Sequence, residues 1–127
     1  MKVLLDTHAL IWWMRDDARL SPAAAAIVRD HRNEILVSAA VGWEMAIKIN
    51  LGKIRPASLL DDLELVIAHE AFVELPVSLA HSVRAGMLPC HHRDPFDRLL
   101  AAQAQLLDLP ILSADQLLDQ YGIQRVW

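Results

Sequence analysis

The helix that begins at Asp94-Pro95 is the feature that most restricts how this chain can fold. Asp suits the N-cap position, where its carboxylate accepts from free backbone N–H groups, and Pro suits the first helical position, which needs no donor. The residues that follow leave so little polar surface that we expect the helix to be buried along most of its length against a sheet. Its apolar residues are Phe96, Leu99, Leu100, Ala104, Leu106 and Leu107.

The first turn of this helix is unusually acidic. Asp94 occupies the N-cap and Asp97 the N3 position, with His91 and His92 just upstream and Arg98 beside them. Capping and the helix macrodipole both favour acids here, which is a sufficient explanation for Asp94. One cap is enough, so the second acid indicates a polar cluster that requires a cation or a metal ion as its partner.

Length and composition restrict the class of protein. The 127 residues are expected to form one domain covering 1–127, and a content of 54% hydrophobic and 22% charged residues excludes disorder. No apolar run approaches the ~18 residues of a membrane span, so we expect a soluble protein without membrane association. Asp6 interrupts the N-terminus too early for a signal peptide, and the single Cys90 cannot form an internal disulfide. Both observations favour the cytoplasm. The net charge of −4 argues against a broad basic surface for nucleic acid, although a metal ion in an acidic pocket can still bind a polyanion.

Short apolar runs alternate with helical patterns along the chain. This alternation predicts an α/β fold, a three-layer α/β/α sandwich around a mostly parallel central sheet of four to five strands. In such folds, ligands bind beyond the carboxyl ends of the strands. The expected strands are 2–5, 35–38, 72–75, 111–113 and 123–126, and the expected helices are 7–14, 23–30, 39–50, 58–69, 78–85 and the helix that starts at 95.

Two stretches leave alternatives open. Glu44 and Lys48 are four residues apart, and helical periodicity alone favours a surface ion pair, with Trp43 in the core. Asp6 is as well explained as a helix cap as by a function. Because Trp12 and Trp13 are adjacent, at least one must face outward unless another element covers it, which makes it a candidate interface residue.

Four acids are expected to meet at one edge of the sheet. Asp6 ends the first strand, Glu44 lies on the helix after the second, Asp97 opens the buried helix and Asp115 follows the fourth strand. Four carboxylates in one cleft raise each other's pKa unless a cation neutralises them. Hard oxygen ligands without Cys or paired His favour Mg²⁺ or Mn²⁺ over Zn²⁺, and such an ion can activate water against a phosphodiester.

Four motifs, in order, resemble the PIN-domain toxins of VapBC type. They are LLDTHAL at 4–10, Val37-Ser38 with WEMAIK at 43–48, HRDPFDR at 92–98, and Ser113-Ala114-Asp115. The resemblance runs nearly from end to end. It implies a PIN-like fold and a metal-dependent endoribonuclease that hydrolyses RNA, is held inactive by a cognate antitoxin and is often a homodimer.

The resemblance also assigns roles to residues. It implies that Asp6, Glu44, Asp97 and Asp115 hold one or two metal ions and that a metal-activated water attacks phosphorus. Asp94 matches one branch of the family and stays open between ligand and helix cap, and the chain departs from that branch at Val41, where Ser is common. The candidates for orienting ligands or substrate phosphate are Arg98, Lys48, Thr7 and His92.

Three other interpretations compete with this one. A phosphoacceptor signalling module needs an acid pair after the first strand and a late Lys, but Asp6 stands alone there and no Lys follows Lys53. A catalytically silent binding domain would have no need for all four acids. Cys90 and His91 could form a nucleophile and base, but adjacent residues rarely point toward each other and no third orienting group is evident.

Overall fold

A five-stranded parallel sheet forms the centre of the molecule. The computed structural model describes residues 1–127 and gives the strand order β3-β2-β1-β4-β5, with every neighbouring pair parallel. The predicted α/β class and parallel sheet are therefore confirmed. The third and fourth strands are each one residue shorter than expected, and the last, which follows the left-handed Gly122 (φ +68°), is two residues shorter. The strands are β1 (Lys2–Leu5), β2 (Glu34–Ser38), β3 (Val73–Leu75), β4 (Ile111–Leu112) and β5 (Arg125–Val126).

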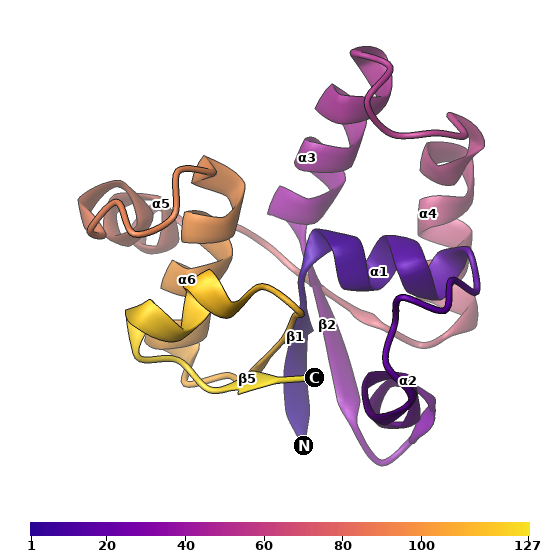
Figure 1. Cartoon of the computed structure of the whole chain (residues 1–127), viewed down its shortest axis with the longest axis horizontal. Helices are drawn as coiled ribbons and strands as arrows, with labels where there is room; N and C mark the ends of the chain where they lie inside the picture. Colours follow the sequence, from indigo (N-terminus) through magenta and orange to yellow (C-terminus); the bar gives the residue numbers. More distant parts are fainter.

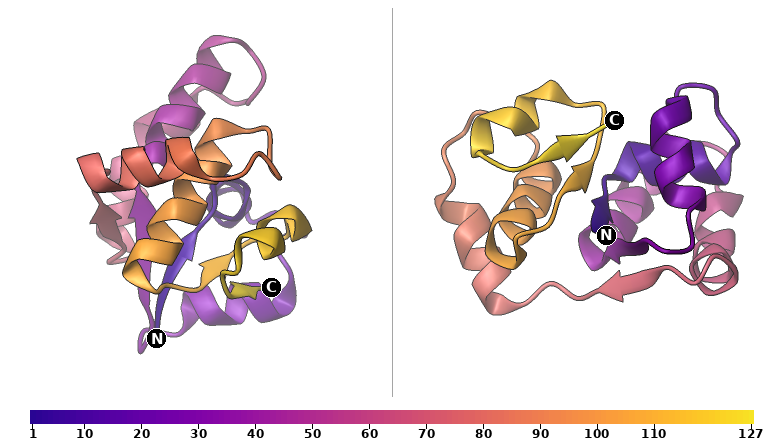
Figure 2. Two further views of the ribbon diagram at one scale, coloured as in Figure 1. Left: turned by 90° about the vertical axis from the view of Figure 1, so that its left-hand side faces the viewer. Right: turned by 90° about the horizontal axis from the view of Figure 1, so that it is seen from below.

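Helices lie on both sides of the sheet. Figure 1 shows α1, α2 and α4 to one side of the central strands and α5 and α6 to the other, and the view from below in Figure 2 shows the same separation. This is the expected three-layer arrangement. The helices are α1 (Thr7–Met14), α2 (Pro22–Arg29), α3 (Ala39–Asn50), α4 (Ser58–His69), α5 (Leu79–Met87) and α6 (Pro95–Leu107), followed by a short 3₁₀ helix, η1 (Gln116–Tyr121).

Strand β1 is the central strand of the sheet. Its residues Val3, Leu4 and Leu5 are completely buried, as expected for a parallel strand with helices on both faces. Leu4 is in register with Leu36 of β2 on one side and with Ile111 of β4 on the other. The carboxyl ends of β2, β1 and β4 are therefore adjacent. The chain places β2 and β3 on one side of β1 and then β4 and β5 on the other, and open α/β sheets bind ligands at such a change of direction.

A residue that caps a helix lies at or just after the end of each of these three strands. Asp6 accepts from the backbone N–H of Ala9 and caps α1, Ser38 caps α3, and Asp115 caps η1. A cap binds backbone donors in the first turn of its helix, so its position is fixed relative to both strand and helix. The capping chemistry thus places polar side chains at one edge of the sheet.

Two predictions about packing are wrong. Trp43 was expected in the core but is 61% exposed, because α3 turns Ala40, Val41, Glu44 and Met45 inward. The helix α6 buries residues 100–104, but Leu106 and Leu107 in its last turn are 39% and 41% exposed. Apolar composition therefore overestimated the buried length of the helix. None of the helices combines the length and apolar character that crossing a membrane would require.

Candidate active site

The carboxylate of Asp6 joins the ends of β1 and β4. It is 4% exposed, and its Oδ1 accepts from the backbone N–H of Ala9 at 2.7 Å. The Ser113 hydroxyl donates to the other oxygen of Asp6 and accepts from the backbone N–H of Asp115 at 3.0 Å. Ser113 stands in a motif that the sequence analysis singled out, but its role in fixing two acids was missed because only the acids were considered.

Glu44 is a buried acid and not part of a surface ion pair. Its side chain is almost fully enclosed, Thr7 donates to its Oε1 at 2.5 Å, and Lys48 pairs with its Oε2. The pairing of Glu44 with Lys48 was predicted, but the burial of Glu44 was not. Although burial opposes the charged form of Lys48, the hydrogen bond and charge of Glu44 outweigh it and raise the lysine pKa. Lys48 is therefore a fixed positive charge, and its Nζ lies 3.9 Å from Asp94.

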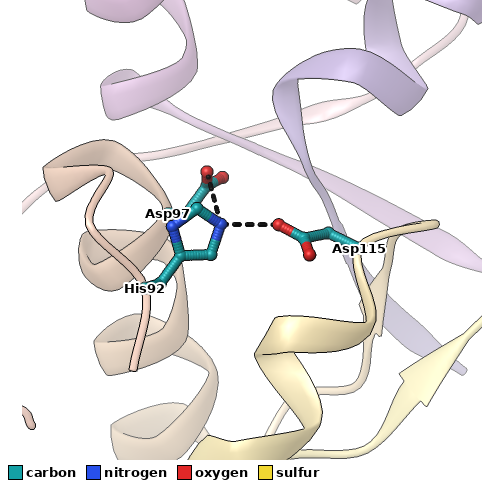
Figure 3. Close-up of side chains that lie close together, drawn as sticks. All are labelled: His92, Asp97 and Asp115. Carbon is teal, nitrogen blue, oxygen red and sulfur yellow. Dashed lines mark hydrogen bonds and ion pairs between the residues drawn. The ribbon is translucent and has the colours of Figure 1, made fainter. Parts of the chain in front are cut away.

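His92 lies between two of the predicted acids (Figure 3). Its Nε2 is 2.5 Å from Oδ2 of Asp115 and 3.2 Å from Oδ2 of Asp97. The three side chains could provide a metal ion with one ligand atom each, all within 4.8 Å of one another. The structure thus brings Asp115 beside His92, which is 23 positions away in the sequence.

The backbone around His92 is anchored by Tyr121 and Arg98. The Tyr121 hydroxyl accepts from the His92 N–H at 2.9 Å and donates to the carbonyl of Pro89 at 2.8 Å. Arg98 Nη1 donates to the carbonyls of His92 and Arg93 at 2.8 and 3.2 Å. Arg98 therefore holds the loop, and Tyr121 is a supporting residue that the sequence analysis missed, because no local pattern connects it to this loop.

Asp94 is the N-cap of α6, as predicted. Its Oδ1 accepts from the backbone N–H of Phe96 at 2.8 Å, while its Oδ2 faces Lys48. Its charge also acts on Asp97, whose pKa it raises. Asp94 thus belongs electrostatically to the acid cluster even though its geometry is that of a cap.

Lys48 alone does not balance the negative charge of the acids. Burial, followed by the charge of Asp94, raises the pKa of Asp97 to about 7; Glu44 and Asp6 add to the rise, and His92 opposes it. Burial also raises the pKa of Asp6, against the hydrogen bond from Ser113. A cation would relieve this repulsion, and clustered carboxylate oxygens are the donors that Mg²⁺ and Mn²⁺ prefer, so the residues present fit such an ion.

A hollow opens beside the acids. It has a volume of about 290 Å³, and Asp6 and Asp115 contribute to its lining. An extended substrate can therefore reach the acids from this side. The other residues that line it are His8, Trp12 and Ala114.

Comparison with known proteins gives the family. The sequence model of the PIN domain matches residues 3–124, so the chain belongs to the PIN-domain family, and the resemblance drawn from the four motifs is confirmed. Ribonuclease VapC22 of Mycobacterium tuberculosis (strain ATCC 25618 / H37Rv) is 35% identical over 104 residues, which are 80% of this chain and 78% of the relative. Ribonuclease VapC16 of the same organism is 41% identical over 81 residues, covering 54% of this chain and 55% of the relative.

Solved structures share the fold. VapBC2 from Rickettsia felis, bound to a DNA fragment from their promoter, aligns with 99% of this chain and 98% of the matched chain at a TM-score of 0.70 and 12% identity. The phosphoacceptor alternative is not favoured, since flavodoxin-like signalling domains have the strand order 2-1-3-4-5, unlike the order 3-2-1-4-5 here.

The raised pKa of Asp97 predicts how stability depends on pH in the metal-free protein. Between the ordinary value of 3.8 and about 7, the folded state binds more protons than the unfolded state, so the free energy of unfolding falls as the pH rises through this range. Asp97→Asn should remove this loss, which is on the order of a few kcal/mol, and should be more stable than the parent at about pH 8. Urea unfolding at several pH values measures the effect.

The matched control is Glu64→Gln, which changes an exposed acid on α4. It should keep the pH dependence of the parent. An Asp97→Asn protein whose stability follows the parent's pH curve would contradict the assignment of the raised pKa to Asp97.

Proposed function

We propose that this protein is a metal-dependent endoribonuclease, the toxin of a type II toxin–antitoxin pair, and that it hydrolyses RNA phosphodiester bonds. The observation that carries the proposal is the gathering of buried acids at the carboxyl edge of the sheet, with the pKa of Asp97 raised to about 7. The relatives VapC22 and VapC16 are named ribonucleases, which supports RNA as the substrate.

In this proposal Asp6, Glu44, Asp97 and Asp115 hold one or two Mg²⁺ or Mn²⁺ ions. A divalent ion bound by carboxylates polarises a phosphate and lowers the pKa of water, which supplies the nucleophile. The protein contributes the orientation of its acids, since Ser113 fixes Asp6 and Thr7 fixes Glu44. These hydrogen bonds reduce the freedom that metal binding would otherwise have to remove.

Lys48 is proposed to balance charge and to meet the substrate phosphate. Its ammonium group lies between Glu44 and Asp94, and its side chain is 27% exposed. A fixed cation at the border of an acidic cluster reduces its repulsion toward a polyanion. Arg98 is assigned to the loop rather than to the substrate, because its guanidinium binds backbone carbonyls.

The test is cleavage of single-stranded RNA by the purified protein. Cleavage should require Mg²⁺ or Mn²⁺ and stop on addition of EDTA, because the chain has no other cation able to activate water at these acids. Asp97→Asn should be close to inactive. Asp94→Asn should keep most of the activity since Asn caps a helix nearly as well as Asp, whereas Asp94→Ala should lose about 0.5–2 kcal/mol of stability.

Two results would contradict this proposal. Undiminished cleavage in EDTA would exclude metal dependence. An active Asp97→Asn protein together with an inactive Asp94→Asn protein would make Asp94 the ligand and leave Asp97 as an acid of the first helical turn.

A cognate antitoxin peptide is proposed to bind beside α1. Arg19 and Trp127 cover Trp12, while Arg29 and Phe72 cover Trp13, so neither tryptophan is left bare. A hollow of about 340 Å³ lies between α1 and α4, and its lining combines apolar and acidic side chains. It is lined by Met14, Leu59, Leu65 and Val66, with Asp62, His69 and Glu70.

An amphipathic peptide with basic residues fits this hollow, and an Arg from the same peptide could bind among the acids. Hydrogen exchange of the complex should show protection in residues 8–14 and across α4. Leu65→Glu should weaken antitoxin binding by at least about tenfold, since it replaces an exposed apolar side chain of the hollow with a charge that the peptide would cover. Protection confined to other regions would contradict this placement.

A homodimer is proposed through the outer face of α5. Leu79, Val83 and Met87 follow one another at four-residue spacing and are 81%, 59% and 81% exposed. Side chains at this spacing form one stripe on a helix, and an exposed apolar stripe indicates a protein interface.

The dimer is tested by light scattering. Val83→Glu should convert a dimer to a monomer, because the substitution buries a charge in the apolar contact. Leu65→Glu on α4 is the matched control and should leave the dimer intact, while Val83→Glu should retain antitoxin binding. An unchanged mass for Val83→Glu would exclude this face.

A further inference from the structure

The hydrogen bonds of His92 determine which ring nitrogen carries the proton. Nδ1 lies 3.1 Å from the backbone nitrogen of Asp94, and a backbone N–H can only donate. Nδ1 is therefore an acceptor without a proton. The N–H of the ring must then be at Nε2, which faces Asp115 at 2.5 Å and Asp97 at 3.2 Å.

This tautomer is unsuited to metal coordination. A histidine binds a metal ion through a nitrogen that has no proton, but here the nitrogen between the acids is the donor. Coordination through Nε2 would require the proton to move to Nδ1, where the N–H of Asp94 already points. In this arrangement His92 donates to the acids and does not act with them as a ligand.

The ring nitrogen also stands close to where a bridging ion would be. Mg²⁺ needs oxygen ligands at roughly 2.0–2.1 Å. The two Oδ2 atoms that could supply them already face Nε2, at 3.2 Å for Asp97 and 2.5 Å for Asp115 (Figure 3). The ring N–H and the ion would therefore compete for the same carboxylate oxygens.

The position of His92 is built into the fold. Tyr121 and Arg98 hold its backbone N–H and carbonyl, and the ring is only 12% exposed. Neighbouring His91 makes none of these contacts with the acids and packs against the ring of Tyr121. Its backbone is fixed at two atoms and its ring is mostly enclosed, so the ring has a defined position beside the two carboxylates.

We propose that His92 is a positioning residue that holds Asp97 and Asp115 together through its Nε2–H and is displaced when a divalent ion binds between them. This inference rests on the proposed metal-dependent function. It makes the imidazole a competitor of the ion, so His92 sets how much metal the site requires before it is loaded.

The experiment measures Mn²⁺ binding without RNA, from the electron paramagnetic resonance signal of free Mn²⁺. His92→Ala should bind Mn²⁺ about tenfold more tightly than the parent, a change comparable to the loss of one charge-assisted hydrogen bond. His92→Gln keeps an N–H at similar reach and should lie closer to the parent. His91→Ala is the matched control and should bind as the parent does.

Nuclear magnetic resonance of ¹⁵N-histidine tests the parent protein without any substitution. The metal-free protein should show the His92 tautomer protonated at Nε2, and Mg²⁺ should change the ring nitrogen resonances as the ring leaves the acids. This measurement also keeps the proposal open to test if the variants fail to fold.

Three outcomes would overturn the inference. Weaker Mn²⁺ binding by His92→Ala, with ¹⁴N coupling to the bound ion in the parent, would make His92 a ligand. Unchanged Mn²⁺ affinity in His92→Ala, or ring resonances that Mg²⁺ does not alter, would make it a bystander. A parent that binds no Mn²⁺ at all would instead remove the metal-dependent function on which the inference rests.

Discussion

Repulsion between carboxylates at one sheet edge is the constraint on which the rest of the site depends. Two of the acids have side-chain donors of their own: Ser113 for Asp6, and Thr7 with Lys48 for Glu44. Asp97 has only His92, which it shares with Asp115. Burial and the charge of Asp94 raise the pKa of Asp97 to about 7, and a cation at this carboxylate would oppose both effects.

The sheet brings these acids together through its strand order. Because β2 and β4 flank β1, three chain segments that are far apart in sequence end side by side. Each strand passes directly into a capped helix, so the side chains at the junctions have little freedom to move away. Stability and chemistry use the same residues here: Asp6 and Asp115 each cap a helix with one oxygen and keep the other for the cluster.

The sequence predicted the fold more completely than the site. Three helices begin and end at the predicted residues, since caps and periodicity are local signals. Periodicity shows which residues share a helix face but not which face turns inward, so a buried Glu44 beside an exposed Trp43 inverted the expected packing. The links from Ser113 to Asp6 and from Tyr121 to His92 depend on tertiary contacts, for which a single sequence has no local pattern.

The contact between Ser113 and Asp6 spans 107 residues, so it can form only after most of the chain has been synthesised. A growing chain that has emerged as far as β3 can pair β1 with β2, yet it lacks Asp97, Ser113 and Asp115. The open edge of β1 receives its second neighbour only when β4 arrives, and Tyr121 secures the loop later still. An emerging chain therefore has no complete acid cluster during most of its translation. Because the protein is proposed to cut RNA, the ribosome that makes it meets the complete site only when synthesis ends.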